Sequence, residues 1–281
     1  MSITARCITL SSGALMPALG WGTWEMGERP AKRGDEVEAL SLGLELGILM
    51  VDTAEMYGDG AAERLVAAAI AGRRPRTFLV SKVYPHHATR RGIIAACERT
   101  LERLETDYLD LYLLHWRGDI PLEQTIAGFE ALRAKGRIRG WGVSNFDTAD
   151  MQELMALPGG QHCVANQVLY HLAGRGVEWE LLPFCRRHKV AVMAYSPLGR
   201  GRLLRHRALQ NIARRIDASP AQVALAWLLA QADVGAIPKA ARVTHVRECA
   251  AAAELVLSPQ VMSELDEAYP APTGPTPLEI I

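Results

Sequence analysis

The stretch TFLVSKVYPHHATRRGIIAACERTLERLETDYLDLYLLH, residues 77–115, carries the pattern that decides the fold. Two short apolar runs, 77–82 and 109–114, are typical of strands buried on both faces. Between them, residues 88–104 have the pattern of an amphipathic helix. A strand, a helix and a second strand in this order predict a βαβ unit, in which the two strands run parallel.

The same alternation extends along the chain. It predicts eight strands, at Ala18–Gly22, Ile48–Asp52, Thr77–Lys82, Leu109–Leu114, Arg139–Val143, Cys163–Val168, Val190–Tyr195 and Val234–Ile237. Eight βα units in 281 residues predict an α/β fold, a (β/α)8 or TIM barrel. A doubly wound sheet is the alternative, but no G-x-G-x-x-G follows any of these strands.

Helix-ending and helix-starting residues support the pattern. Residues 122–136 finish on Gly136, a residue type that commonly follows a helix. Residues 219–231 open with Ser219 as the expected N-cap and Pro220 at the first helical position.

The two ends of the chain have patterns of their own. Residues 6–19 (RCITLSSGALMPAL) predict a β-hairpin that turns at 11–13, and in a barrel it would cap the bottom. The Pro-rich tail 270–281 predicts an extended surface segment. No interdomain linker is visible, so residues 1–281 are expected to form one domain.

Composition excludes several classes of function. Lys+Arg and Asp+Glu are both 31, so neither nucleic acid nor an anionic membrane is the expected partner. The five cysteines form no CxxC pair, which argues against a zinc site or a disulfide framework. The N-terminal residues lack the apolar core of a signal peptide, and the most apolar stretch, 40–51, is too short to span a bilayer. A cytoplasmic protein without a metal is expected.

Four polar residues lie at or just beyond the ends of three successive predicted strands: Asp52, Tyr57, Lys82 and His115. In a parallel barrel these ends share one rim, where such enzymes carry their active sites. A phenol, an ammonium, a carboxylate and an imidazole at one rim can together protonate a carbonyl oxygen.

Tyr57 is the expected general acid. A phenol has an ordinary pKa of about 10, and a neighbouring ammonium lowers that pKa. Lys82 would supply the ammonium, Asp52 would keep Lys82 charged and oriented, and His115 would hydrogen-bond the substrate carbonyl. Singly, each residue has an ordinary structural explanation, and Asp52 with Glu55 also matches D-x-x-E, the pattern of a helix N-terminus.

A histidine pair and a basic segment are not expected to form a metal site or a nucleic-acid site. The pair His86–His87 lacks a third ligand nearby, so exposure to solvent is favoured over metal binding. The basic segment 199–207 follows the seventh strand, where a surface loop or a loop covering a cofactor is favoured over a nucleic-acid site.

Eight ordered motifs resemble those of the aldo-keto reductases: GWGTW (20–24), VDTAEMYG (51–58), SKVYP (81–85), LLHW (113–116), WGVSNF (141–146), ANQVLYH (165–171), AYSPLGRG (194–201) and IPKA (237–240). The resemblance covers nearly the whole chain and is closest to bacterial members that reduce methylglyoxal. It implies a monomeric barrel that uses NADPH to reduce small aldehydes and reactive ketones, with Asp52, Tyr57, Lys82 and His115 as the catalytic tetrad.

The resemblance also implies contacts for the cofactor and the substrate. Ser144, Asn145 and Gln167 would bind the nicotinamide amide, and Tyr195 would stack on its ring. Further cofactor contacts are implied for Gly22, Thr23, Trp24, Asp52, Ser196, Leu198, Lys239, Ala240, His245, Glu248 and Cys249, with Lys239 on the 2′-phosphate. The substrate pocket would be lined by Trp21, Trp24, Tyr57, His115 and Trp116.

Two positions depart from the family pattern. His245 and Cys249 stand where many members carry an arginine on the adenosine phosphate and an asparagine on the adenine. Because a neutral imidazole binds phosphate less well than a guanidinium, NADH tolerance is expected beside NADPH preference.

Two rival functions stay open at this point. Lys82 in a barrel can form a Schiff base, as in aldolases. A barrel that senses the redox state of NADP and acts through a partner protein is the other alternative.

Overall fold

The apolar runs form one eight-stranded sheet in a computed structural model, which describes residues 6–281. Its strands are β3 (Gly20–Gly22), β4 (Met50–Asp52), β5 (Phe78–Val83), β6 (Leu109–Leu114), β7 (Ile138–Ser144), β8 (Cys163–Leu169), β9 (Ala191–Tyr195) and β10 (Val234–Ile237). Every neighbouring pair is parallel, and the order in the sheet follows the order in the sequence. Each predicted strand therefore exists within a few residues of its expected bounds.

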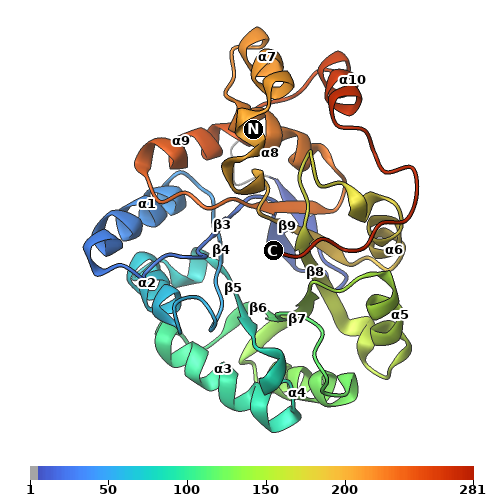
Figure 1. The fold of residues 1–281 in the computed structure, drawn as a ribbon. Helices are drawn as coiled ribbons and strands as arrows, with labels where there is room; N and C mark the ends of the chain where they lie inside the picture. The colour runs from blue at the N-terminus through green and yellow to red at the C-terminus, as the bar shows by residue number, and fades with distance from the viewer. Residues whose placement is uncertain (1–5) are drawn as a thin grey trace.

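The sheet closes on itself, as Figure 1 shows in a view into the barrel. Leu19, just before β3, bridges Ala236 on β10, and the N–H of Gly22 donates to the carbonyl of Pro238 at 2.9 Å. Closure excludes the doubly wound alternative, which would leave two open edges. The predicted (β/α)8 barrel is confirmed.

Helices surround the strands (Figure 1). They are α1 (Arg33–Glu45), α2 (Ala61–Ile70), α3 (Arg90–Leu104), α4 (Leu122–Ala134), α5 (Thr148–Ala156), α6 (Leu181–Arg187), α7 (Arg207–Arg215), α8 (Pro220–Ala230), α9 (Val243–Ala252) and α10 (Pro259–Ala268). The expected helix ends are present: Ser219 caps α8 in a capping box with Gln222, and Gly136 follows α4 with a φ of 69°. Buried apolar side chains of these helices and of the sheet form one core, and α10 packs on α7 outside the barrel.

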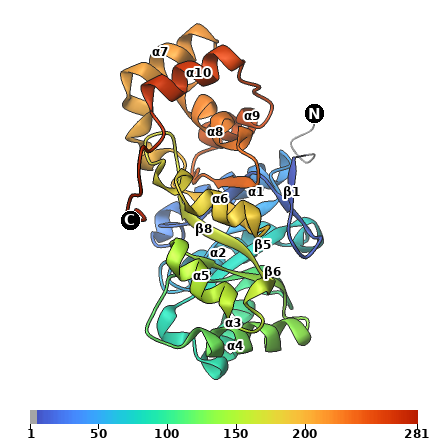
Figure 2. The same cartoon turned by 90° about the vertical axis from the view of Figure 1, so that its right-hand side faces the viewer.

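The N-terminal hairpin pairs β1 (Cys7–Thr9) with β2 (Leu15–Pro17). Gly235 lies near the start of β10, and a Cβ placed on it would lie 3.5 Å from Cδ1 of Ile8. The hairpin therefore caps the N-terminal end of the barrel, as predicted. Figure 2 places β1 and the end of the C-terminal tail on opposite sides of the barrel.

Strand register brings the polar residues together. Asp52 pairs with Gly22 and Val80, and Lys82 pairs with Leu113, two residues before His115. Parallel strands in this register end at one rim, so residues 30 positions apart in sequence meet there. The tail from residue 270 to 281 has no regular secondary structure and runs back toward that same rim (Figures 1 and 2).

Candidate active site

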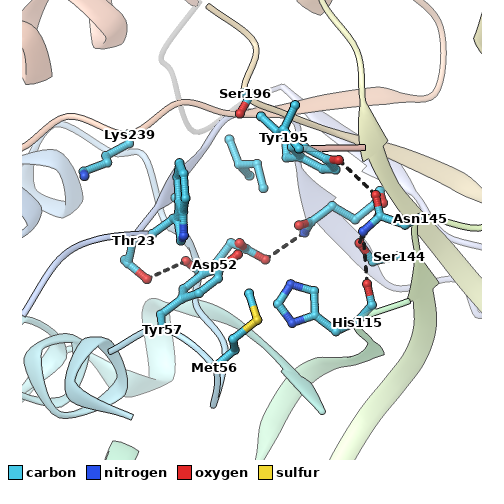
Figure 3. Close-up of a pocket in the computed structure, with 15 residues that line it drawn as sticks. Thr23, Asp52, Met56, Tyr57, His115, Ser144, Asn145, Tyr195, Ser196 and Lys239 are labelled. Atoms are coloured by element: carbon cyan, nitrogen blue, oxygen red, sulfur yellow. Dashed lines mark hydrogen bonds between the residues drawn. The ribbon is translucent and has the colours of Figure 1, made fainter. Parts of the chain in front are cut away.

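A pocket opens at the C-terminal rim, over the carboxyl ends of the strands (Figure 3). It holds about 700 Å³ of space that is partly open to solvent. It is lined by Gly22, Thr23, Trp24, Asp52, Met56, Tyr57, His115, Ser144, Asn145, Gln167, Tyr195, Ser196, Ile237, Lys239 and Ile281.

Lys82 lies beneath this pocket and is completely buried. Its Nζ donates to Asp52 Oδ2 at 2.7 Å, to the carbonyl of Thr53 at 3.0 Å and to the Tyr57 hydroxyl at 3.0 Å. All three protons of an ammonium are thus used. Burial alone would lower the pKa of Lys82, but the neighbouring Asp52 carboxylate and Tyr57 hydroxyl outweigh it and raise that pKa. A charged, fully bonded amine has no lone pair for a carbonyl, which argues against the Schiff-base alternative.

The Tyr57 phenol carries an upward pKa shift. Burial raises the pKa of Tyr57, the Lys82 ammonium opposes that effect and the Asp52 carboxylate reinforces it, so the net direction is upward. The sequence predicted only the lowering by Lys82, and it missed the larger effect of desolvation because burial is a property of the fold. The phenol therefore holds its proton at neutral pH, as a proton donor must.

His115 faces Tyr57 across the pocket floor (Figure 3), with ring centroids 5.8 Å apart. Burial, with a further contribution from Lys82, holds the pKa of His115 well below its ordinary value. The imidazole is therefore neutral at neutral pH. A neutral ring can donate one hydrogen bond to a carbonyl oxygen without competing with Tyr57 as the acid.

Polar side chains on the opposite wall are tied to one another. Asn145 Nδ2 donates to the carbonyl of His115 at 3.1 Å, and its Oδ1 accepts from the Tyr195 hydroxyl at 2.9 Å. Gln167 Nε2 donates to Asp52 Oδ1 at 2.8 Å, and the Ser144 hydroxyl donates to the carbonyl of Gln167. These bonds fix an array of amide groups beside an aromatic ring.

At the other end of the pocket, Lys239 Nζ lies 3.4 Å from the carboxylate of Glu25. Arg200, in the basic segment 199–207, places its guanidinium 4.5 Å from the ring centre of Trp24. An amide array at one end and cations at the other fit a ligand with an amide-bearing ring and phosphate groups. The donor set therefore matches the nicotinamide cofactor that the sequence implied.

Five residues predicted to bind the cofactor do not line this pocket: Leu198, Ala240, His245, Glu248 and Cys249. His245 is exposed on α9, whereas Cys249 is buried and its thiol pKa is raised to about 12 by desolvation and the nearby Glu248. These two side chains on one helix thus have very different access to a ligand.

The structure does not bring Trp21 into the lining of this pocket. Its indole is 1% exposed and lies against Gly43 of α1, because successive side chains of β3 point to opposite faces of the sheet. Trp24 does line the pocket. Trp116 is not among the residues that line it, and its ring lies tilted beside His115, at 5.0 Å between ring centroids.

Three pocket residues were missed by sequence reasoning: Met56, Ile237 and Ile281. Met56 lies next to Tyr57 in the loop after β4, and Ile237 is the last residue of β10, so their positions near predicted site residues were a usable signal. Ile281 was missed because the tail was expected only at the surface, although its apolar end, LEII, could have indicated docking.

The helix-start interpretation of Asp52 with Glu55 is also wrong. No helix begins there, since α2 starts at Ala61 after Gly60, and the Asp52 carboxylate is bonded to Lys82 and Gln167. Within residues 6–281, no cluster of three potential metal ligands occurs, and no helix is long and apolar enough to cross a membrane.

Comparisons with known proteins agree with this geometry. The family model described as "Aldo/keto reductase family" matches residues 18–270. Methylglyoxal reductase YeaE of Escherichia coli (strain K12) is 52% identical, over 98% of this chain and 99% of that protein. Glyoxal reductase of Bacillus subtilis (strain 168) is 34% identical, over 98% of this chain and 97% of that protein.

A solved structure gives the same result in three dimensions. The crystal structure of an aldo/keto reductase from Klebsiella pneumoniae in complex with NADP and acetate superposes with a TM-score of 0.96 at 50% identity, covering 98% of this chain and 99% of that one. Sequence, fold and site geometry agree, and this chain belongs to the aldo/keto reductase family.

Proposed function

We propose that this protein uses NADPH to reduce small aldehydes and reactive ketones, such as methylglyoxal, to alcohols. The main support is a buried chain of hydrogen bonds: Lys82 Nζ donates to Asp52 Oδ2 at 2.7 Å and to the Tyr57 hydroxyl at 3.0 Å. Tyr57 and His115 both line the same pocket. Methylglyoxal enters the proposal because a relative with 52% identity is a methylglyoxal reductase.

When bound, the cofactor supplies the hydride. Tyr57 donates its proton to the carbonyl oxygen of the substrate, and Lys82, which already donates to the phenolic oxygen, stabilises the phenolate that remains. The neutral His115 imidazole donates a hydrogen bond to the same carbonyl oxygen and orients it. Asp52 keeps Lys82 charged, and because it also holds Gln167, it links the acid to the amide wall.

Cofactor choice follows from the other end of the pocket. Lys239 lines the pocket, and we assign it as the cation that meets the 2′-phosphate of NADPH. Solved structures of similar proteins contain NADP and NADPH, which supports the choice of cofactor. His245 stands where many family members carry an arginine, and an imidazole is a weaker phosphate partner than a guanidinium, so NADH is tolerated at lower efficiency.

The cellular location and the oligomeric state are also part of the proposal. We place the protein in the cytoplasm as a monomer, supported by its scattered cysteines and balanced charge. A sensor of NADP redox state is not favoured, because the four residues required for proton transfer are all present and in contact range.

The test is NADPH consumption with methylglyoxal and a panel of small aldehydes, with wild type beside Tyr57→Phe. Loss of a general acid lowers kcat about 10²–10⁴-fold. Tyr108→Phe makes the same chemical change at the other end of the barrel, where the ring lies against Arg74 and Arg139, and should leave kcat unchanged. Turnover that survives Tyr57→Phe would refute the proposed acid, and no turnover with any carbonyl would refute the function.

A further inference from the structure

Glu55 is a buried carboxylate that the proposed chemistry does not use. It lies in the loop that carries Tyr57, two residues before the phenol, and it is only 6% exposed. A carboxylate is costly to bury unless it is hydrogen-bonded and paired. Since no helix begins at Glu55, its partners must be sought elsewhere.

The partners of Glu55 lie on the strand that carries Lys82. The backbone N–H of Glu55 donates to the carbonyl of Lys82 at 3.3 Å. Its carboxylate Oε1 accepts from the N–H of Tyr84 at 2.8 Å. One residue thus fastens the Tyr57 loop to the end of β5 at two points, one on each side of Val83.

A second layer holds the Glu55 carboxylate itself. His87 Nδ1 lies 2.9 Å from Oε1, and Arg99 Nη2 of α3 lies 3.9 Å from Oε2. The His87 ring packs against His86, with ring centroids 4.3 Å apart, and stands edge-on to the Tyr84 ring. His87 is therefore partly covered and engaged, in contrast to the solvent-facing position that the sequence suggested.

We propose that Glu55 is the positioning residue that sets the distance between the Tyr57 hydroxyl and Lys82 Nζ. Tyr57 sits on a loop and Lys82 on a strand, so their 3.0 Å contact depends on how the loop is held against the strand end. This inference rests on the proposed function, because it assigns Tyr57 the proton transfer. A displacement of about 1 Å at a reacting group can cost on the order of 100-fold in rate.

The chain offers a matched control in Asp110. Asp110 is also 6% exposed, and it also accepts a backbone N–H of the β5 segment, that of Leu79 at 2.9 Å. Two basic side chains hold it as well, Arg74 and Arg139, at 2.9 and 3.0 Å. Asp110 lies at the start of β6, so the same kind of anchor sits at the end of the barrel remote from Tyr57.

The experiment compares Glu55→Ala, Glu55→Gln and Asp110→Ala with wild type and Tyr57→Phe. For each, kcat is measured with methylglyoxal at saturating NADPH, the Kd of NADPH by fluorescence, and Tm by thermal melting. Glu55→Ala should lower kcat about 10–100-fold while the NADPH Kd stays within about twofold. Glu55→Gln keeps an oxygen for the Tyr84 N–H and should recover most of kcat. Asp110→Ala should lower Tm but leave kcat unchanged.

Three outcomes would overturn the inference. If Glu55→Ala folds and keeps the wild-type kcat, Glu55 is a structural anchor only. The same conclusion follows if this variant loses Tm but keeps kcat, as Asp110→Ala is expected to do. A raised NADPH Kd with unchanged kcat would place its effect on the cofactor. If Glu55→Ala does not fold, Glu55→Asp is measured in its place, because the aspartate side chain is one methylene shorter and its carboxylate does not reach the Tyr84 N–H. The inference then requires kcat to fall about tenfold while NADPH binding is unchanged, and an unchanged kcat would overturn it.

The Tyr57→Phe arm separates the inference from the function. If Tyr57→Phe collapses activity while Glu55→Ala does not, the reductase stands and the role of Glu55 is wrong. If wild type reduces no carbonyl, the function fails and the inference falls with it.

Discussion

Asp52→Asn should destabilise the protein strongly, because it leaves a buried ammonium without its counter-charge. Lys82 is fully buried, and Asp52 is the only carboxylate among the three groups to which its Nζ donates. Asparagine matches aspartate in size, so packing is retained, but its single amide oxygen can accept from Gln167 or from Lys82 and not from both, so the charge and one hydrogen bond are lost.

The expected loss in the free energy of unfolding can be estimated from a typical value and an upper limit. Removing one partner of a buried ion pair typically costs about 3–5 kcal/mol. The loss is capped at about 5 kcal/mol, the cost of deprotonating a lysine of ordinary pKa at pH 7, since the folded variant can shed the proton instead. We therefore expect a loss of about 3–5 kcal/mol in the free energy of unfolding at pH 7.

Urea unfolding of wild type, Asp52→Asn, Lys82→Met and the double variant measures this effect. The double variant removes both charges, so its loss should be smaller than the two single losses added together. A loss below about 1 kcal/mol for Asp52→Asn, the range of exposed ion pairs, would refute the reasoning.

The pH dependence gives a second check. In wild type the pKa of Lys82 is raised, so its contribution is present at neutral pH and is lost only as pH rises through that value. In Asp52→Asn the lysine pKa in the folded state falls below its unfolded value, and the unfolded chain then binds more protons. The stability of the variant should therefore rise between pH 7 and 9, by up to about 1.4 kcal/mol per pH unit.

Three further outcomes are expected. Gly43→Ala would place a Cβ 2.1 Å from Trp21 Nε1 and should cost about 1–3 kcal/mol in unfolding free energy with kcat unchanged. Gly34→Ala, in the same helix, would place its Cβ in open space and should not destabilise the protein, so equal Tm values for the two variants would contradict this expectation. His245→Arg should raise the preference for NADPH over NADH about tenfold in kcat/KM, and an unchanged ratio would show that this position does not meet the 2′-phosphate. Because the pKa of His115 is held well below 6.5, kcat should show no histidine titration between about pH 6 and 8 in a pH–rate profile, and a break near 6.5 would argue against a neutral imidazole.

Much of the architecture was accessible from local patterns. Short apolar runs such as 109–114 predicted buried parallel strands, and Ser219 with Pro220 predicted the start of α8, because both signals depend on neighbours in the chain. The position of Asp52, Lys82 and His115 at the ends of three successive strands also predicted a shared rim. The (β/α)8 barrel makes this inference possible, since it aligns all carboxyl strand ends on one side.

Burial and side-chain direction were not accessible in the same way. The phenol pKa of Tyr57 rises because desolvation exceeds the pull of Lys82, and the extent of desolvation depends on everything packed around it. Trp21 faces α1 because successive side chains of β3 alternate between the two faces of the sheet, and in a strand of three residues the sequence motif does not say which side chain points into the barrel.

The sequence by itself determined the repeated βα units, the residue types at the strand ends and hence the class of chemistry. Only the tertiary structure decided that Glu55 is bonded to the end of β5 and is not part of a helix start, that His87 contacts its carboxylate, and that Ile281 lines the pocket. The physical reason is range: helix and strand patterns arise from contacts a few residues apart, whereas these contacts join segments about 30 or more residues apart and form only when the barrel closes.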